Sequence, residues 1–186
     1  MNFKRDLLLI DLEMTGLETS KHEIIQIGSL LLDRKTLREK QSYMTYVASK
    51  KWENRDPVSM KINGIQKADL IGAPSLMEVL GEFVSLYGYS SMITVWGGTL
   101  DTFFLKAAFE KCKLKYGYDY HVFNIWSLAY PILAKQNKLT ATGKFSGFGV
   151  DQLLKKYKIK VDGKRHDALT DCRIEAEILR HIMKEL

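Results

Sequence analysis

Two carboxylates stand at the end of an apolar stretch near the N-terminus. The segment LLLIDLEMTG, residues 7–16, has the composition of a buried strand, yet it carries Asp11 and Glu13. Residues two apart in a strand project to the same face, about 6.5 to 7 Å from one another. Two acids held in this way repel each other unless something positive lies between them. The pair is therefore either satisfied by lysines or backbone N–H groups or part of a metal site, and this stretch alone favours neither reading.

Other candidate ligands lie where other elements end, because a hard divalent cation takes several oxygen ligands. Asp101 lies between an expected strand and an expected helix, where a helix N-cap is the simpler role. In KRHDALTDCRIEAEIL, residues 164–179, Asp167 is the expected N-cap of the last helix. Asp171 then lies in the first turn, near the positive end of the helix dipole, and His166 lies just outside the helix. We expect a fixed carboxylate beside a movable imidazole, although His166 alone would suit a surface loop.

The elements that must position these residues follow from periodicity. Three apolar runs rich in β-formers come first and are typical of a strand meander, after which strand and helix patterns alternate. The expected strands are 6–14, 23–33, 41–48, 91–97 and 122–126. The expected helices begin at Ser75, with Glu78 completing a capping box, at 101 and 150, and at about 168, and Pro131 marks a bend or a start. We predict one domain over residues 1–186, an α/β fold on a mixed sheet, with 140–149 as the loosest segment.

Composition limits the class of protein. The 186 residues are 46% hydrophobic and 27% charged, which is typical of a globular chain. No apolar run approaches the roughly 18 residues of a membrane span and no signal peptide is evident, so a cytoplasmic protein is expected. Cys112 and Cys172 have neither metal-site nor disulfide spacing. The net charge of +6 favours a polyanionic partner, although each lysine cluster alone is more simply a solvated surface.

Three motifs in order resemble the DnaQ-like family of 3′→5′ exonucleases, in the subgroup with Asp, Glu, Asp, Asp and a His five before the last Asp (DEDDh). The resemblance spans roughly residues 6–183. It is carried by IDLEMTGL, VWGGTLDTFFL and RHDALTDCRIEAEIL, and the connecting segment INGIQKADLIGAPSLMEVLGEF is also similar. Asn63 stands where many members have His. Two departures stand out: Gly97 and Gly98 replace a frequent His-Asn or Gly-Asn, and no polymerase or helicase portion is recognised.

The resemblance implies a ribonuclease H-like fold, with a mixed sheet of about five strands flanked by helices, and a pair of divalent ions, Mg²⁺ or Mn²⁺. Asp11 would bridge both ions, Glu13 and Asp171 would complete the first, and Asp101 would hold the second. His166 would act as general base, because imidazole ordinarily loses its proton near pH 6.5. Two such metal ions would neutralise the charge that develops on the phosphate, the attacking water and the leaving oxygen.

The resemblance also implies a pocket for a terminal nucleotide directly after the first strand. The backbone around Met14 and Thr15 would meet the nucleotide, Gly16 would allow close approach, and Leu17 would wedge against the base. The implied partner is a single strand of nucleic acid with a free 3′ end. Binding to a membrane is not expected. A polymerase partner and a homodimer are both left open.

Several alternatives remain open from the sequence. The runner-up is a ribonuclease H-type endonuclease, and a non-catalytic nucleic-acid-binding module is a further reading that the complete set of five side chains disfavours. DLEMTGL is closest to oligoribonucleases, whereas residues 57–87 and VDQLLKKYKI are closer to polymerase proofreading subunits, so DNA and RNA are not distinguished. Core packing is the expected role of the aromatic residues Trp96, Trp126, Phe145 and Phe148.

Overall fold

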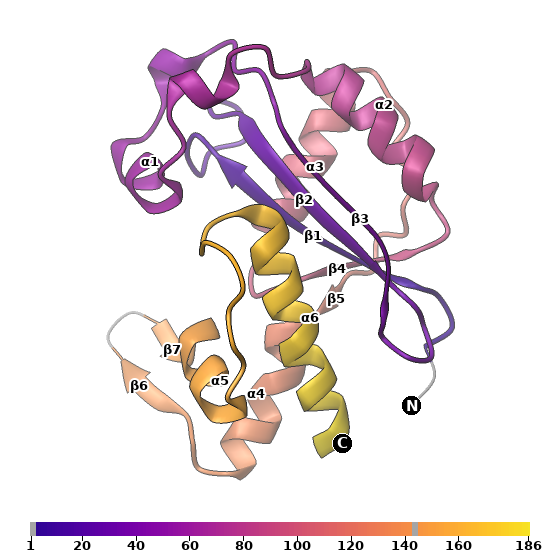
Figure 1. Ribbon diagram of the computed structural model, residues 1–186, viewed down its shortest axis with the longest axis vertical. Coiled ribbons are helices and arrows are strands. Elements are labelled where there is room, and N and C mark those ends of the chain that lie inside the picture. The colour runs from indigo at the N-terminus through magenta and orange to yellow at the C-terminus, as the bar shows by residue number, and fades with distance from the viewer. Residues whose placement is uncertain (1–2, 143–144) are drawn as a thin grey trace.

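A mixed sheet forms the centre of the structure (Figure 1). The computed structural model describes residues 3–142 and 145–186, without the side chains of 140–147. The strands are β1 (Leu7–Met14), β2 (Ile24–Leu32), β3 (Glu39–Tyr46), β4 (Met92–Val95) and β5 (Phe123–Asn124). Their order is β3-β2-β1-β4-β5, with β1, β2 and β3 antiparallel and β4 and β5 parallel to β1. The mixed sheet of five strands predicted from the sequence is confirmed.

Helices cover both faces of this sheet. They are α1 (Pro57–Asn63), α2 (Leu76–Tyr87), α3 (Leu100–Lys111), α4 (Ile125–Lys135), α5 (Val150–Tyr157) and α6 (Ala168–Glu185). α2 and α3 pack on one face, whereas α4, α5 and α6 pack on the other. Short 3₁₀ turns at Trp52–Asn54 and Lys67–Leu70 flank α1. Within the described residues, none of the helices is long and apolar enough to cross a membrane.

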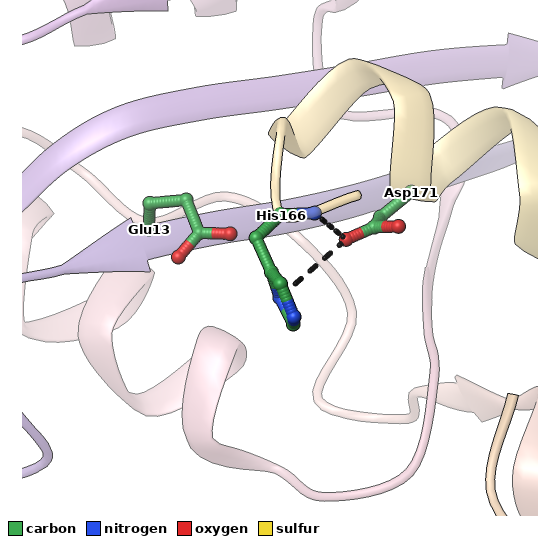
Figure 2. A group of neighbouring side chains, drawn as sticks. All are labelled: Glu13, His166 and Asp171. Atoms are coloured by element: carbon green, nitrogen blue, oxygen red, sulfur yellow. Dashed lines mark hydrogen bonds and ion pairs between the residues drawn. The ribbon is translucent and has the colours of Figure 1, made fainter. Parts of the chain in front are cut away.

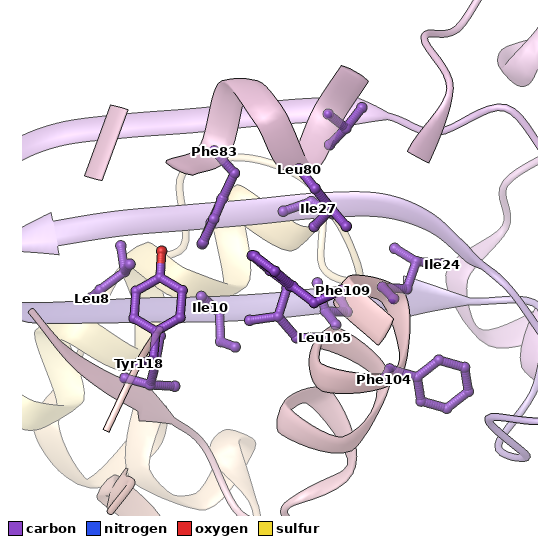
Figure 3. Close-up of a cluster of buried hydrophobic side chains, with 14 of the residues drawn as sticks. Leu8, Ile10, Ile24, Ile27, Leu80, Phe83, Phe104, Leu105, Phe109 and Tyr118 are labelled. Atoms are coloured by element: carbon purple, nitrogen blue, oxygen red, sulfur yellow. The ribbon is translucent and has the colours of Figure 1, made fainter. Parts of the chain in front are cut away.

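The hydrophobic side chains are buried in two main clusters, one on each face of the sheet. The even-numbered residues of β1 belong to the first core, which lies between the sheet and helices α2 and α3. Leu8, Ile10 and Leu12 are buried together with Phe83 of α2 and Phe109 of α3 (Figure 3). Burying such side chains stabilises the fold by about 1.5 to 3 kcal/mol each. Truncation of one of these side chains would weaken the packing of α2 and α3 on the sheet.

The odd-numbered residues of β1 face α6 instead. Leu7 and Leu9 are fully buried in the second core, which α4 and α6 complete. Side chains alternate along a strand, so Asp11 and Glu13 continue the row toward α6. The strand therefore begins as core and ends as a polar site on the same face.

Two helix starts agree with the capping signals in the sequence. Ser75 and Glu78 form the predicted capping box at α2. Asp167 is the N-cap of α6, where its side chain accepts a hydrogen bond from the backbone N–H of Thr170. A further cap was not predicted: Asp56 caps α1 by accepting from the Ser59 N–H at 2.8 Å, although Asp-Pro is a readable start signal.

The structure corrects one expectation about the C-terminal half and adds detail to two others. The strand predicted at 122–126 is only β5, because Asn124 caps α4 by accepting from the Ser127 N–H at 3.1 Å. Pro131 lies inside α4, which excludes the helix start but not the bend, the other expected alternative. The segment 140–149, expected to be the loosest, contains a hairpin of β6 (Thr140–Thr142) and β7 (Phe145–Gly147).

Candidate active site

Burial and mutual repulsion make the two acids of β1 a candidate site for a cation. Burial, with Asp171 and Asp101 adding, raises the pKa of Glu13 to about 8. Burial, followed by the charges of Asp101, Glu13 and Asp171, raises the pKa of Asp11 well above its usual range. These carboxylates resist ionisation unless positive charge is present, so the reading in which surface lysines satisfy them does not describe this structure.

Close approach of α6 to β2 brings Asp171 to the acids of β1. Gly28 pairs with Asp11 across the β1–β2 ladder. A Cβ atom at Gly28 would lie 2.2 Å from the carbonyl carbon of Ala168, at the start of α6. Only the absence of a side chain permits this packing.

The side chain of Gln26 fixes the start of the same helix. Gln26 pairs with Glu13 and is 1% exposed. Its Nε2 donates to Asp167 Oδ2 at 3.2 Å, and its Oε1 accepts from the Ala168 N–H at 3.0 Å. Sequence reasoning missed Gln26 and Gly28, although a polar residue and a glycine inside an apolar strand were a readable signal.

His166, Asp171 and Glu13 converge in front of α6 (Figure 2). Each of the three residues offers one atom that could bind a metal, a ring nitrogen or a carboxylate oxygen, and these atoms lie within 4.8 Å of one another. His166 lies outside the helix, as predicted, with its side chain 45% exposed against 12% for that of Asp171. The backbone N–H of His166 donates to Asp171 Oδ2 at 2.9 Å, and the imidazole Nδ1 lies 4.0 Å from the same oxygen. Its φ of 60° is in the left-handed region, which is costly for a residue with a Cβ.

The positively charged guanidinium of Arg165 pairs with the carboxylate of Asp171 in this structure. Its Nε donates to Asp171 Oδ1 at 2.7 Å, and its Nη1 donates to Asp151 Oδ1 of α5 at 2.9 Å. The guanidinium charge also opposes the upward pKa shift of Asp11. Arg165 is thus a further residue of the site that was not predicted.

Asp101 reaches the site from α3. The N-cap of α3 is Thr99, so the expectation that Asp101 is the cap is wrong. Its Oδ1 instead accepts from the Leu12 N–H of β1 at 3.2 Å, because β4 pairs with β1 only as far as Leu9. Burial raises the pKa of Asp101 to about 6.

The backbone of the turn after β1 is held from two sides. The N–H of Thr15 donates to the Glu23 carbonyl, and the N–H of Glu23 donates to Thr15 Oγ1, both at 2.9 Å. On the other side, the Asp56 N–H donates to the Thr15 carbonyl at 2.6 Å, and Asn63 Nδ2 donates to the Met14 carbonyl at 3.2 Å. Asn63, which departs from the family pattern, therefore positions the predicted nucleotide turn.

Gly16 and Leu17 complete this turn in different ways. A Cβ atom at Gly16 would lie 2.4 Å from the ring of His22, so the turn closes over that imidazole. The N–H of Glu18 donates to His22 Nδ1 at 3.0 Å. Leu17 is 65% exposed and lies beside a hollow of about 380 Å³. The apolar tip is therefore free to meet a ligand.

Glu23→Gln should loosen this turn. Glu23 Oε2 accepts hydrogen bonds from Ser49 Oγ and from the backbone N–H groups of Lys50 and Lys51. Burial alone would raise the pKa of Glu23, but these bonds outweigh it and hold the pKa below its usual range. We expect the variant to lose about 1.5 to 3 kcal/mol of unfolding free energy at pH 7.

The pH dependence of that loss follows from linkage. A carboxylate with a lowered pKa in the folded state contributes stability above its unfolded pKa, about 4.3, and loses it as pH falls through the folded value. Urea unfolding at pH 7 and at about pH 3.5 should show the deficit shrinking in acid. Glu110→Gln, on the exposed surface of α3, is the control. An equal deficit at both pH values would contradict this account.

Most of the aromatic residues near the site pack against one another, as expected. Trp96 and Phe148 pack against the second core. Trp126 stacks on Phe148 with centroids 5.3 Å apart and donates from Nε1 to its carbonyl oxygen at 3.2 Å. Trp96 also lines a cavity of about 460 Å³ together with Asp11. The side chain of Phe145 lies outside the described residues.

The donor set fits hard divalent cations. Asp11, Glu13, Asp101 and Asp171 offer carboxylate oxygens, the ligands that Mg²⁺ and Mn²⁺ prefer. The upward pKa shifts of Asp11 and Glu13 show that positive charge would be stabilised between them. An orphaned carboxylate oxygen in the same cavity, described below, adds to this fit.

Comparison with solved structures supports the same architecture. The chain superposes on the nuclease domain of 3'hExo, a DEDDh family member bound to rAMP, with a TM-score of 0.74 and 19% identity, covering 100% of this chain and 95% of that one. It superposes on E. coli exonuclease I in complex with a dA16 oligonucleotide with a TM-score of 0.77 and 14% identity, covering 94% of this chain and 40% of that one. At these identities the likeness shows the fold, and the predicted ribonuclease H-like fold is confirmed.

Sequence comparison identifies the family. DNA polymerase III subunit epsilon of Aquifex aeolicus (strain VF5) is 33% identical over 81 residues, which are 44% of this chain and 38% of that protein. The chain thus matches well under two thirds of that relative's length. A family model described as Exonuclease (RNase_T) matches residues 8–179. The chain therefore belongs to this exonuclease family, and it is a DnaQ-like exonuclease.

Proposed function

We propose that this protein is a divalent-metal-dependent 3′→5′ exonuclease that releases nucleoside 5′-monophosphates from single-stranded DNA or RNA. The observation that carries this proposal is the convergence of Glu13, His166 and Asp171 within 4.8 Å, directly before the turn that begins at Met14. Asp11 and Asp101 add two further carboxylates to the same site.

The residues divide into ligands and a base. Asp11, Glu13 and Asp171 would hold one ion, and Asp11 with Asp101 would hold another. When bound, such ions supply Lewis-acid stabilisation of the charge that develops on the phosphate and on the leaving oxygen. His166, exposed at the rim, accepts the proton of the water that attacks phosphorus. The bond from phosphorus to the 3′ oxygen breaks, and the leaving oxygen takes a proton to become the new 3′ hydroxyl.

The turn after β1 supports attack at the end of a strand. Thr15 is held by backbone hydrogen bonds, Gly16 packs against His22, and Leu17 is exposed beside them. A terminal nucleotide bound there would place its phosphodiester next to Glu13. A paired end would have to fray first, at a cost of a few kcal/mol. The net charge of +6 would add affinity that is independent of sequence and that weakens as salt rises.

Matched 5′-labelled DNA and RNA strands would test this proposal. With Mg²⁺ or Mn²⁺ we expect a ladder that shortens by single nucleotides, slow attack on blunt duplexes, inhibition by a 3′-phosphate and no cleavage with chelator. Internal cuts in a circular single strand would instead favour the ribonuclease H-type endonuclease. Binding without cleavage would favour the non-catalytic module. The DNA and RNA arms decide the sugar preference.

Leu17→Ala should weaken use of the substrate without removing metal. Fully burying a leucine side chain is worth about 1.5 to 3 kcal/mol, so losing a contact that covers part of it should raise KM roughly 10-fold while Mn²⁺ affinity is unchanged. Ile71→Ala removes another highly exposed side chain, 82% exposed, and should leave KM as in the wild type. An unchanged KM in Leu17→Ala would remove the wedge role from this residue.

We extend the proposal to protein partners. The curated relative is a subunit of a DNA polymerase, which supports a polymerase as the partner to test first. Light scattering of the protein with and without a polymerase catalytic subunit would separate a heteromeric complex from a homodimer.

A further inference from the structure

Glu175 is a buried acid outside the set of five candidate site residues, which are Asp11, Glu13, Asp101, His166 and Asp171. It lies on α6 one turn after Asp171, so the two side chains share a helix face with Cβ atoms about 5 to 6 Å apart. Glu175 is 4% exposed and lines the same cavity of about 460 Å³ as Asp11 and Asp171. A fifth carboxylate therefore faces the candidate site.

Nothing in the described part of the chain satisfies this carboxylate fully. Its Oε2 is buried and has no hydrogen-bond partner there. A carboxylate buried without compensation is costly, and removing it from water is tolerated when a cation or donors replace the lost hydration. The nearby cation, Arg165, already donates to Asp171 and Asp151. Glu175 thus retains an acceptor that points to a missing positive partner.

The neighbours of Glu175 indicate where that partner would be. Glu175 shares its cavity with the carboxylates of Asp11 and Asp171. Burial, followed by the charges of Asp11, Asp101 and Asp171, raises the pKa of Glu175 well above its usual range. Glu13 and Asp171 already serve the side of the site that His166 occupies. In the proposed function, the second ion would have only Asp11 and Asp101 as ligands. It would therefore have fewer carboxylates than the first ion, which has Asp11, Glu13 and Asp171.

We propose that Glu175 is a further carboxylate of the cation site, which binds a divalent ion together with Asp11, the β1 carboxylate that lines the same cavity, directly or through one water. This inference rests on the proposed function, because it adds a ligand to the same metal site. A protonated Glu175 that only fills space in the core is the competing explanation, and it predicts no effect on metal binding.

Calorimetric titration with Mn²⁺ in the absence of nucleic acid would test this role. We expect the wild type to bind Mn²⁺ in a tighter and a weaker step. Glu175→Gln keeps the size of the side chain and removes its charge, and it should weaken one step by about 10-fold or more. Glu177→Gln, which alters a more exposed acid of the same helix that pairs with Arg180, is the matched control and should bind as the wild type does.

Thermal melts in chelator separate a ligand from a structural residue. We expect Glu175→Gln to melt no lower than the wild type without metal, and to gain less in Tm when Mn²⁺ is added. Glu175→Asp, which keeps the charge but retracts it, should also bind Mn²⁺ more weakly. Unchanged Mn²⁺ affinities in both variants, or a lower Tm with affinity intact, would overturn the assignment.

The outcomes also distinguish this inference from the proposed function. If the wild type binds no Mn²⁺ and cleaves no strand, the exonuclease proposal fails. If the wild type binds and cleaves while Glu175→Gln matches it in both affinities, the role of Glu175 fails and the proposed function stands.

Discussion

Asp11→Asn should abolish cleavage of single-stranded nucleic acid, with turnover falling by more than about 10³-fold. The substitution removes the charge of the carboxylate that, in the proposed function, would contact both ions. It should leave the fold intact, because asparagine has nearly the same shape and Asp11 stands at the polar end of a strand whose core residues are unchanged. Single-turnover assays with Mg²⁺ and with Mn²⁺ would measure the loss.

Metal-free stability gives the same substitution a second readout. Burial and three neighbouring acids raise the pKa of Asp11, so the folded protein binds protons that the unfolded chain releases. Stability in chelator should therefore fall as pH rises from about 4, the ordinary carboxyl pKa, toward the raised values. Asp11→Asn should melt higher than the wild type at pH 8 and lose this advantage near pH 4.

A control at the other end of the same strand isolates the site. Asp6 directly precedes β1, at the opposite end of the strand from Asp11 and Glu13, and pairs with Lys40 at 2.7 Å. Asp6→Asn should keep the turnover of the wild type. Near wild-type turnover in Asp11→Asn would remove Asp11 from the metal site.

His166→Ala should lower turnover by roughly 10²- to 10⁴-fold, the usual contribution of a positioned general base. The imidazole can accept the proton of the attacking water, whereas alanine offers no base in its place. Single-turnover assays of both proteins with Mg²⁺ would measure the loss. His121→Ala changes an exposed histidine that pairs with Asp119, and it should behave as the wild type does.

Metal binding distinguishes a base from a ligand at His166. Its ring nitrogen lies close enough to Glu13 and Asp171 to share an ion with them. If His166 is the base, Mn²⁺ affinity should be nearly unchanged in His166→Ala while turnover collapses. A parallel loss of Mn²⁺ affinity would make it a ligand, and an unchanged turnover would make it a loop residue.

Local patterns in the sequence were sufficient for one part of this site. The period of two along β1 places Asp11 and Glu13 on one face. Capping preferences place Asp167 at the start of α6, and hence Asp171 in its first turn with His166 outside the helix. These features depend on residues close together in the chain, so their spacing is enough to predict them.

The rest depended on contacts between residues far apart in the chain. Gln26 binds Asp167 across 141 positions, and Asp101 accepts from the Leu12 N–H across 89, where the sequence alone favoured an N-cap. Glu175 reads as an ordinary polar residue of a long helix, and only packing against the sheet buries it beside Asp11. Which face a side chain takes is a local property, but what it meets there is decided when separate elements pack, because burial and charge depend on everything brought within a few ångströms.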